Sequence, residues 1–503
     1  MDITFKALHK NIMEWMAGPV GSVVIHVALI LAAVLLISTT VREKTTEIEV
    51  KMVEVDDKQL DDLMEDLKPP EDLPEMVDTV TPPDVDIDMD VPQEPQDFTP
   101  SPVMDTVAEL NIASDAISPI VLKGLTAGQM TQRSGEGRAA SIGAYGGQWG
   151  QAAEAAVLRA LRWLKNNQNE DGSWSTEAKG SGKRAALTSL GILTFLAHGE
   201  TPASAEYGET VTRAIRYVVA CQDDKGHFYP DKEKGSDASA YVQAICVYAI
   251  SEAYSMTRIP SLKSVMENGT AIIVGGIQPS GGYDYQWKQD GRIDVSLGAW
   301  CCQAMKSAYI AGCQNPKLHD AMEKALEAFK RNQAEGGHFK YSNAKTSPAY
   351  ANMTAAAVLC FQLLGHGGEK AVQEGLRALK DEKCVWENPQ NWPMYGWYYI
   401  SQAKFHQGGQ AWASWNNQFA PQFIKNQRRS DDPKIDGSWV SAGLNIPGNG
   451  GDREDWGTAP PVYATTLAAL TLTVYYRFLP TYKPIETEKI DQTSSTDVEI
   501  EIL

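Results

Sequence analysis

A repeat of about fifty residues, present six times, most strongly constrains how this 503-residue chain can fold. Five copies place a glutamine a few residues before a glycine and an aromatic residue, as Gln168, Gly172 and Trp174 do in the first copy, and the weaker fifth copy keeps only the aromatic residue, Trp386. The aromatic positions follow one another at intervals of 47 to 57 residues: Trp174, Phe228, Tyr285, Phe339, Trp386 and Trp439. A fixed period of this length indicates stacked supersecondary units rather than one ordinary compact core.

Each unit is predicted to contain two helices. The helix before the glutamine is amphipathic, as in residues 156–168 and 321–333, whereas the helix after the turn is nearly uncharged, as in residues 350–365. This alternation implies two concentric layers with the apolar helices inside. We therefore expect a mainly α protein in which residues 151–482 close into a six-hairpin α/α toroid. The repeated residues receive structural roles: glycine turns the chain, the aromatic ring wedges between hairpins, and glutamine bonds helix-end amides.

The segment from Arg159 to Trp174 resembles the prenyltransferase/squalene oxidase repeat, also called the QW repeat of squalene cyclases. The six-unit array resembles the α/α toroid shared by terpenoid cyclases, protein prenyltransferase β subunits and complement thioester domains. That resemblance implies a central funnel lined by the N-termini of the inner helices and by aromatic side chains.

The chain lacks the catalytic signatures of these families. No Asp-x-Asp-Asp run, the proton source of class II terpene cyclases, occurs in residues 151–482. Asp294 aligns with the zinc-binding D-x-C of prenyltransferases, but Ser296 replaces the cysteine, and Asn352 and Met353 stand where the distant histidine would be. One hard oxygen ligand does not hold zinc. We expect no metal and no cofactor, and the sequence names no acid, base or nucleophile, which favours a protein that is not an enzyme.

The seven cysteines form no C-x-x-C pair, and several fall within the apolar inner helices. Buried free thiols are therefore expected, with one or two disulfides left open.

Candidate pocket residues come from the inner helices and from one loop. Asp294 is expected to cap an inner helix, with a role as a pocket acid left open. The densest aromatic cluster spans residues 392–415, where rings would stack on sugars, hold an isoprenoid or simply pack helices together. A Gly- and acid-rich loop, residues 448–461, is expected at the funnel mouth. The candidates are Asp294, Trp300, Tyr395, Trp397, Tyr398, Trp412, Asp455 and Trp456.

An uncharged apolar run of 22 residues, 19–40, is interrupted only by His26 and is followed at once by charge. At ~1.5 Å per residue the run extends ~33 Å as a helix, enough to cross a hydrocarbon core of ~30 Å. It is longer than the ~7–15 apolar residues of a cleaved signal peptide. We predict a single membrane-spanning helix over residues 19–41 after a short tail, residues 1–18.

Ser22 and His26 lie four residues apart and would share one face of that helix. An imidazole inside a membrane is costly, so it faces a partner or a proton path, or it bonds a backbone carbonyl. The sequence from Ser22 to His26 resembles the SVxIH anchor of TonB-type energy transducers. The resemblance implies coupling to ExbB/ExbD-like proton-channel subunits and places the toroid on the periplasmic side of the inner membrane. The flanking Lys and Arg residues favour neither orientation.

A long linker, residues 42–150, is predicted between this helix and the toroid. Residues 42–102 contain 20 Asp or Glu against 5 Lys or Arg, with prolines alternating among the acids. Self-repulsion and polyproline II preference would keep this part disordered and extended, and its charge opposes binding to nucleic acid. The Gly/Ser-rich residues 133–150 are expected to form a flexible hinge, and residues 483–503 a C-terminal tail.

Three functions fit these features. The main expectation is a TonB-like energy-transducing or envelope-spanning protein whose toroid binds an envelope receptor or another ligand. The alternative is an enzyme or carrier that acts on a lipid-linked or glycan substrate in the funnel. The second alternative is a structural scaffold.

Overall fold

The computed structural model describes residues 130–175, 182–230, 239–389, 392–442 and 461–477. Several sequence predictions lie outside these ranges: the apolar run 19–41 with Ser22 and His26, the acidic linker, Asp455 and Trp456, and the tail 483–503. Among the described helices, none has the length and hydropathy needed to cross a membrane. The membrane span and its contact with ExbB/ExbD-like subunits therefore stay predictions.

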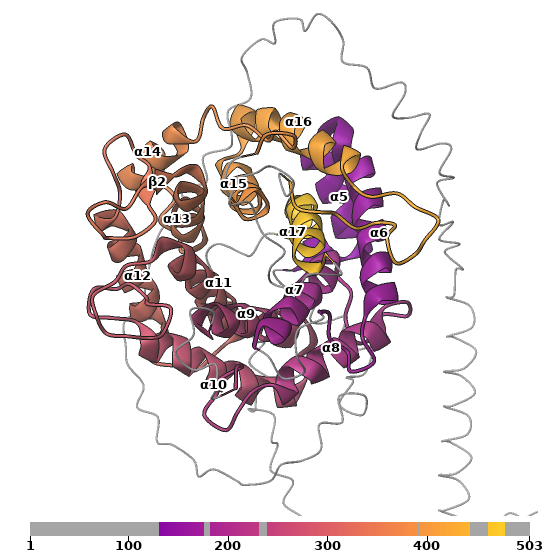
Figure 1. The fold of residues 1–503 in the computed structure, drawn as a ribbon, viewed down its shortest axis with the longest axis horizontal. Coiled ribbons are helices and arrows are strands. Elements are labelled where there is room, and N and C mark those ends of the chain that lie inside the picture. Colours follow the sequence, from indigo (N-terminus) through magenta and orange to yellow (C-terminus); the bar gives the residue numbers. More distant parts are fainter. Residues whose placement is uncertain (1–129, 176–181, 231–238, 390–391, 443–460, 478–503) are drawn as a thin grey trace, which may run out of the picture. The chain divides into compact units, whose positions relative to one another are not determined.

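Twelve helices of the described chain form two concentric rings (Figure 1). The outer ring consists of α6 (Gly150–Asn167), α8 (Gly208–Ala220), α10 (Pro260–Gly276), α12 (Leu318–Arg331), α14 (Lys370–Ala378) and α16 (Gly409–Lys425). The inner ring consists of α7 (Gly182–His198), α9 (Ser239–Thr257), α11 (Val295–Ala311), α13 (Ala351–Leu363), α15 (Pro393–Gln407) and α17 (Val462–Leu472). The predicted mainly helical fold with an α/α toroid is confirmed.

The two rings differ in burial as their sequences require. The outer helix α12 buries one stripe, with Leu318, Met322, Leu326 and Phe329 at helical spacing. In the inner helix α13, every residue except Asn352 is buried. Apolar side chains all around an inner helix fill the space toward both rings, so the core lies between the layers and around the ring.

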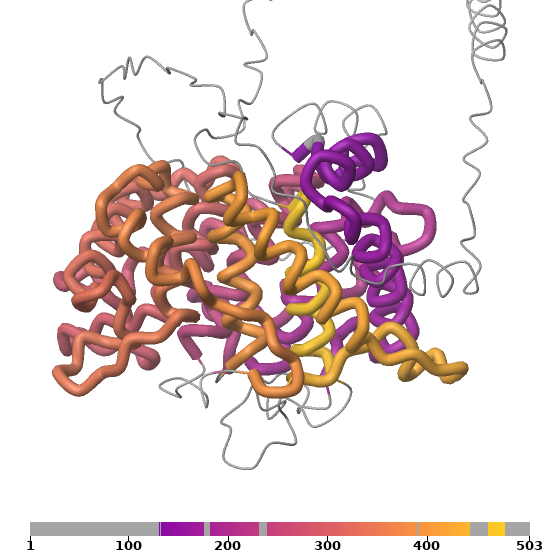
Figure 2. Tube along the Cα trace, turned by 90° about the horizontal axis from the view of Figure 1, so that it is seen from above, coloured from indigo at the N-terminus to yellow at the C-terminus, as the bar shows by residue number. Residues whose placement is uncertain are grey.

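The ring closes through its first and last hairpins, which lie side by side in both views (Figures 1 and 2). Helix α17 packs against α7, and α16 packs against α6. The last repeat glutamine, Gln427, donates its Nε2–H to the carbonyl oxygens of Ala156 and Gly437 at 2.8 and 2.9 Å. A residue of the sixth repeat thus bonds the first outer helix.

Three other repeat glutamines, Gln168, Gln222 and Gln333, make the same pair of bonds, whereas Gln278 in the third repeat donates its Nε2–H to the Arg292 carbonyl at 3.1 Å. Gln168 Nε2 donates to the carbonyls of Gly172 and Thr210, both at 2.9 Å. Gln333 Nε2 donates to those of Gly337 and Ala371 at 3.0 and 2.8 Å. The expectation that glutamine bonds helix-end amides is wrong, because its amide nitrogen ties its own turn to a carbonyl of the next outer helix.

The repeat glycines have left-handed backbone angles and touch the next outer helix. Gly226 has φ +96°, and a Cβ atom there would lie 2.6 Å from the carbonyl oxygen of Asn268. In the third repeat this position is taken by Gly281, at φ +77°, rather than by Gly282. Only glycine allows both the angle and the close approach.

Two of the repeat aromatics, Trp174 and Trp439, lie between the outer and the inner helix of their own hairpin. Trp174 Nε1 donates to the carbonyl of Leu164 in α6 at 2.8 Å, while its backbone N–H donates to Thr188 Oγ1 in α7 at 3.3 Å. Trp439 bonds Phe423 and Thr465 in the same way, at 2.7 and 3.0 Å. Each of these two tryptophans therefore connects an outer helix to the inner helix of the same hairpin.

Residues 133–150, expected to be a flexible hinge, are instead folded onto the toroid. They contain α5 (Gly135–Tyr145), which Ser134 caps by accepting a bond from the Gly137 N–H at 3.1 Å, and the short η2 (Gly147–Trp149). Helix α5 buries Ile142 and contacts α18 (Val474–Arg477). Those apolar and tertiary contacts outweigh the flexibility of a Gly-rich composition. The remaining short elements are η1 (Thr131–Arg133) and the paired strands β1 (Phe339–Lys340) and β2 (Ala349–Tyr350).

All seven cysteines lie within the described ranges and are free thiols, five of them buried.

Replacing Gly226 with alanine tests the close approach of turn and helix. We expect Gly226→Ala to lower the free energy of unfolding by at least about 2 kcal/mol, because a left-handed alanine costs ~1–2 kcal/mol and its methyl group meets the Asn268 carbonyl. The matched control is Gly275→Ala in α10, where a Cβ would meet nothing within 4 Å. That change should be neutral or stabilise by about 0.5–1 kcal/mol. Equal effects in urea unfolding would contradict the assignment.

The contribution of His198 to the stability of the fold is predicted to fall as the pH rises. Its Nε2 lies 3.0 Å from Glu154 and its Nδ1 2.9 Å from Glu200. Burial lowers the pKa of His198, but bonds to the two carboxylates outweigh this and raise the net pKa above 6.5. A raised folded pKa gives stability that is complete below pH 6.5 and is lost as pH rises through the folded value.

We expect His198→Gln to cost about 3 kcal/mol near pH 6, because it breaks a buried ion pair, and less at pH 9. The control is His366→Gln, which also bonds two glutamates but is one-third exposed and should cost under about 1 kcal/mol. Urea unfolding from pH 6 to 9 measures both. A cost at His198 that does not fall with rising pH would refute the charged state.

Candidate functional site

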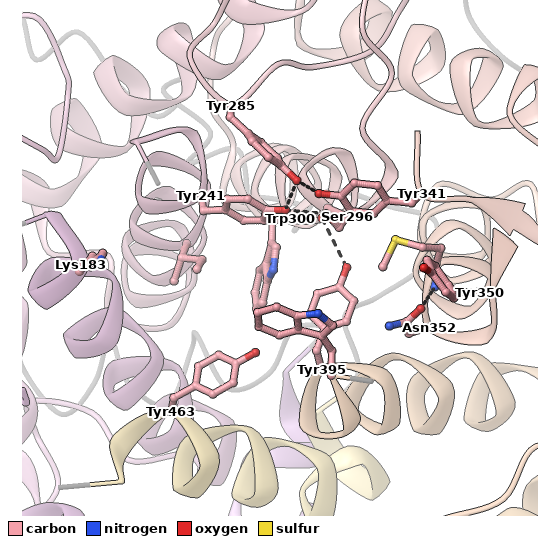
Figure 3. Close-up of a pocket in the computed structure, with 13 residues that line it drawn as sticks. Lys183, Tyr241, Tyr285, Ser296, Trp300, Tyr341, Tyr350, Asn352, Tyr395 and Tyr463 are labelled. Atoms are coloured by element: carbon pink, nitrogen blue, oxygen red, sulfur yellow. Dashed lines mark hydrogen bonds between the residues drawn. The ribbon is translucent and has the colours of Figure 1, made fainter. Parts of the chain in front are cut away.

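A cavity of about 490 Å³ opens at the N-terminal ends of the inner helices (Figure 3). Each of the six inner helices contributes a side chain from its first turn: Lys183, Tyr241, Ser296, Asn352, Tyr395 and Tyr463. All inner helices run in the same direction around the ring, so their first turns meet at one mouth. The volume lies within the range of ~300–1,000 Å³ that small-molecule sites occupy.

The rest of the lining is mostly aromatic. Tyr285 and Tyr341 come from loops, and the other lining residues are Ile245, Trp300, Tyr350, Met353 and Trp392. Tyr350 and Trp392 are 43% and 45% exposed, unusual values for large apolar side chains. Two exposed rings beside one cavity provide a ready contact surface for a ligand.

Trp300 lies on α11, one turn beyond Ser296, and is 3% exposed. Its ring stacks on Tyr398 with centroids 5.8 Å apart and planes at 17°. This stack holds the Trp300 ring rigidly in the cavity wall.

Asp294 lies beneath the lining and is fully buried. It caps α11, as expected, by accepting the Leu297 backbone N–H at 3.0 Å, and it also accepts from Ser296 Oγ and Arg292 Nη2, both at 2.8 Å. Burial raises the pKa of Asp294 above its ordinary value, although these three donors favour the ionised form. In the described residues no group of three or more His, Cys, Asp or Glu could hold a metal ion.

A series of hydroxyl groups leads from Asp294 to the cavity, and Figure 3 shows its members Ser296, Tyr241, Tyr285 and Tyr341. Ser296 Oγ lies 2.5 Å from Tyr241 Oη, which lies 3.5 Å from Tyr285 Oη. Tyr285 Oη in turn bonds Tyr341 Oη. Burial raises the pKa of Tyr241 well above 10, so its phenol stays neutral in ordinary buffers. We call these four hydroxyl groups, of Ser296, Tyr241, Tyr285 and Tyr341, the hydroxyl chain.

The potential at the cavity is set by helix ends and one lysine. The N-terminus of each inner helix carries a partial positive charge of about 0.5, and Lys183 adds a full one. No Asp or Glu occurs among the lining residues in the described part of the chain, and Asp294 is paired with Arg292. The cavity is therefore aromatic, neutral to positive, and rich in hydroxyl groups.

Trp392 precedes α15 in a left-handed conformation, with φ 57° and ψ 55°. A bulky residue with these angles is strained by about 1–3 kcal/mol, and such strain occurs preferentially at binding and catalytic sites. This conformation places the exposed indole ring of Trp392 at the rim of the cavity.

The structure separates the pocket candidates chosen from the sequence. Trp300 and Tyr395 line the cavity, and Asp294 supports it from beneath. Trp397 instead packs on Trp386 and Phe423 between the rings. Trp397 is therefore not among the residues that line this cavity.

Two further candidates, Tyr398 and Trp412, are not among the residues that line the cavity. Tyr398 is fully buried and donates its hydroxyl to Gln303 Oε1 at 3.1 Å. Trp412 belongs to the outer helix α16 and donates its Nε1–H to the Tyr145 carbonyl at 2.9 Å. Aromatic density alone therefore selected packing residues as well as lining ones. Asp455 and Trp456 fall outside the described residues.

Eleven of the thirteen lining residues were not among the candidates chosen from the sequence: Lys183, Tyr241, Ile245, Tyr285, Ser296, Tyr341, Tyr350, Asn352, Met353, Trp392 and Tyr463. One signal could have found five of them. The second or third residue of an inner helix recurs once per repeat at the funnel mouth, and this position is held by Lys183, Tyr241, Ser296, Asn352 and Tyr463.

No family model matches the chain, and no curated protein matches it. Solved structures similar to the fold include an α-1,6-mannanase from a Salegentibacter species, at 13% identity and TM-score 0.44, covering 65% of this chain and 98% of that one. An unsaturated glucuronyl hydrolase from a Bacillus species has 12% identity and TM-score 0.46, with coverage of 65% and 96%. A cellobiose 2-epimerase from Bacillus thermoamylovorans has 11% identity and TM-score 0.46, with coverage of 63% and 95%.

These findings contradict the main functional expectation. The three similar toroids named above are enzymes that act on carbohydrates, and a type II terpene cyclase from Scytonema is also similar, at 11% identity and TM-score 0.40. The interpretation as a TonB-like energy-transducing or envelope-spanning binding protein is corrected accordingly. The alternative, an enzyme or carrier for a glycan or lipid-linked substrate, agrees better. Likeness at this level shows only the fold, so the chemistry of the site is argued from the cavity itself.

Replacing Trp392 with glycine should separate stability from binding. Glycine adopts the left-handed angles freely, so we expect Trp392→Gly to leave the melting temperature unchanged or to raise it by a few degrees. The control Trp397→Gly should lower it by about 5 °C or more, because Trp397 is packed between the rings. Differential scanning calorimetry measures both. A large loss of stability in Trp392→Gly would show that its ring serves packing rather than ligand contact.

Proposed function

We propose that the toroid is the substrate-binding domain of a carbohydrate-active enzyme, with the glycan held in the cavity at the inner-helix N-termini. One observation carries this proposal: six tyrosines and two tryptophans surround a cavity of about 490 Å³ whose polar groups are mostly hydroxyls.

A pyranose ring has the complementary surface. Its C–H faces are apolar and stack on aromatic rings, while hydroxyl groups at its edge require hydrogen-bond partners. Tyrosine satisfies both needs, because it combines a large apolar face with a polar tip. Trp392 and Tyr350 at the rim would receive the ring faces, and the hydroxyl chain deeper in the cavity would bond the edge.

Two features suit an enzyme better than a passive carrier. Strained residues such as Trp392 and buried carboxyl groups with raised pKa such as Asp294 occur preferentially at active sites. Hydrolysis by the usual pair of carboxylic acids needs two carboxyl groups about 5–10 Å apart across the substrate, and the described lining contributes none. The residues seen here therefore supply binding and orientation.

The proposal includes a location. The apolar run 19–41 would anchor the chain in the inner membrane and present the toroid to periplasmic glycans. Membrane fractionation and protease accessibility of intact spheroplasts test this part independently of the cavity.

Ligand binding by the full chain is the decisive experiment. We expect calorimetric titration with three probes, α-1,6-mannotetraose, cellotetraose and an unsaturated glucuronyl disaccharide, to show binding of at least one, and mass spectrometry to show whether it is converted. Tyr350→Ala should weaken that binding by about tenfold, because a lost aromatic contact is worth ~1 kcal/mol or more.

The matched control is Tyr145→Ala, whose side chain is 44% exposed, like that of Tyr350 at 43%, but which does not line the cavity. It should leave binding unchanged. Equal losses in the two variants, or no binding of any probe, would sink the proposal and favour the structural scaffold.

A further inference from the structure

In the described part of the chain, the cavity lining contains one charged side chain, that of Lys183. It is the second residue of α7 and is partly buried. Its ammonium group forms no hydrogen bond and no ion pair with any residue of the described ranges. A partly enclosed lysine without a partner offers a full positive charge and three N–H donors to a bound ligand.

Three of the six inner helices that open into the cavity lack a polar cap. Helices usually begin after Ser, Thr, Asp or Asn, whose side-chain oxygen accepts an N–H bond of the first turn. Helices α13, α15 and α17 begin instead after Tyr350, Trp392 and Pro461, and none of these residues makes a side-chain cap bond. No capping carboxylate therefore offsets the partial positive charge of these three helix ends at the mouth.

Two carboxylates near the lining are occupied elsewhere. Asp294, beneath the lining, is fully buried and pairs with Arg292 at 2.8 Å. Asp284 precedes the lining residue Tyr285, but its Oδ1 accepts two backbone N–H bonds within its own turn, at 2.8 and 3.2 Å. Neither carboxylate belongs to the lining, so the charge of Lys183 is not neutralised within it.

Aromatic rings lie on both sides of Lys183. Helix α7 packs between α17 and α9, whose first turns place Tyr463 and Tyr241 in the lining. Figure 3 shows Lys183 across the cavity from Tyr350 and Asn352. Rings beside an ammonium group exclude water and lower the local dielectric constant, which strengthens the attraction of that group for an anion.

We infer that the cavity selects a sugar that carries a negatively charged group, a carboxylate, phosphate or sulfate, and that Lys183 binds this group. The inference rests on the proposed function and names its substrate class. The sugar ring would stack on the side of Tyr350 and Trp392, and its anionic group would extend toward α7. A neutral sugar would leave the ammonium group unpaired, and an amino sugar would be repelled by it.

Four small probes separate the effect of charge from that of the sugar ring. Methyl glucopyranoside is the neutral sugar, and methyl glucuronopyranoside and the 6-phosphate of methyl glucopyranoside are its anionic counterparts. Cyclohexanecarboxylate carries the charge without sugar hydroxyls. The full chain is labelled with ¹³C-methyl methionine, and the resonance of Met353, which lines the cavity, reports each titration.

We expect at least one anionic sugar to bind the wild-type chain about tenfold more tightly than the neutral sugar, because only the anion makes a charge-assisted bond to Lys183. The carboxylate and phosphate probes distinguish the two kinds of anion. Raising the salt concentration about tenfold should weaken the anionic sugar several-fold and leave the neutral one unchanged.

Lys183→Gln should abolish the preference for the anionic sugar and leave the affinity for the neutral sugar unchanged. Lys183→Arg preserves the charge and should retain most of the preference. The control is Lys317→Gln, which removes the same charge from an exposed residue just before α12 that does not line the cavity. This control should keep the wild-type ratio of affinities.

Equal affinities for neutral and anionic sugars, no binding of any probe, a preference unchanged in Lys183→Gln, or a preference that salt does not weaken would overturn the inference. A thermal melt shows whether Lys183→Gln folds, and the salt titration of the wild-type chain decides the question if it does not. The two proposals fail separately. Neutral sugars bound as tightly as anionic ones would defeat the anionic preference alone, whereas cyclohexanecarboxylate bound as tightly as the anionic sugars would defeat the proposed function and leave Lys183 as an anion site.

Discussion

The toroid depends on one repeated contact, in which a glutamine and a left-handed glycine of one hairpin meet the backbone of the next outer helix. Gly172 would place a Cβ 2.4 Å from the carbonyl of Arg213, and Gly437 would place one 2.4 Å from that of Arg159. The second of these contacts joins the last repeat to the first outer helix. A solenoid that meets itself has no exposed terminal repeat, so the apolar inner helices are covered on every side.

The closure of the ring also determines which helix ends surround the cavity. Since every hairpin has the same handedness, the inner helices expose six N-termini at one mouth and six C-termini at the other. Near the C-terminal end, buried Arg133 donates to the Leu196 carbonyl at 3.3 Å and pairs with Glu252 at 2.8 Å, and Arg477 donates to Tyr248 Oη at 3.3 Å. Two guanidinium groups against one carboxylate leave positive charge beside the negative helix ends, where it is stabilising. That end is closed by polar packing, and the N-terminal end holds the cavity.

The period of the sequence was enough to predict the rings, because a fixed repeat of Gln, Gly and aromatic residues leaves few ways to bury the apolar helices. Details that depend on the exact position of each residue within its repeat could not be predicted as well. Tyr285 occupies an expected wedge position, yet the fully buried ring of the third repeat is Tyr283, and Tyr285 lines the cavity. The one-residue shift to Gly281 explains the difference, and no local pattern indicates it.

The cavity could be predicted only in part for a similar reason. Trp397 and Tyr398 lie close to Tyr395 in the sequence, but neighbouring residues on a helix point in different directions, so only Tyr395 reaches the cavity. Residues 133–150 were expected to be flexible because of their composition, but they are folded. The burial of Ile142 depends on residues that are distant in the sequence. Local composition does not report such long-range contacts.

The first turns of the inner helices are the positions that the fold constrains least. The repeat contacts use the turn glycines, the glutamines and the aromatic wedges, and the core uses the middle of each inner helix, whereas Tyr241, Asn352 and Tyr463 face the cavity. Packing alone would accept small or apolar residues there. Tyrosine, serine and asparagine at these positions, together with a tryptophan in a strained conformation, take no part in the repeat contacts described above. Their presence is therefore best explained by a ligand that contacts the first turns of the inner helices.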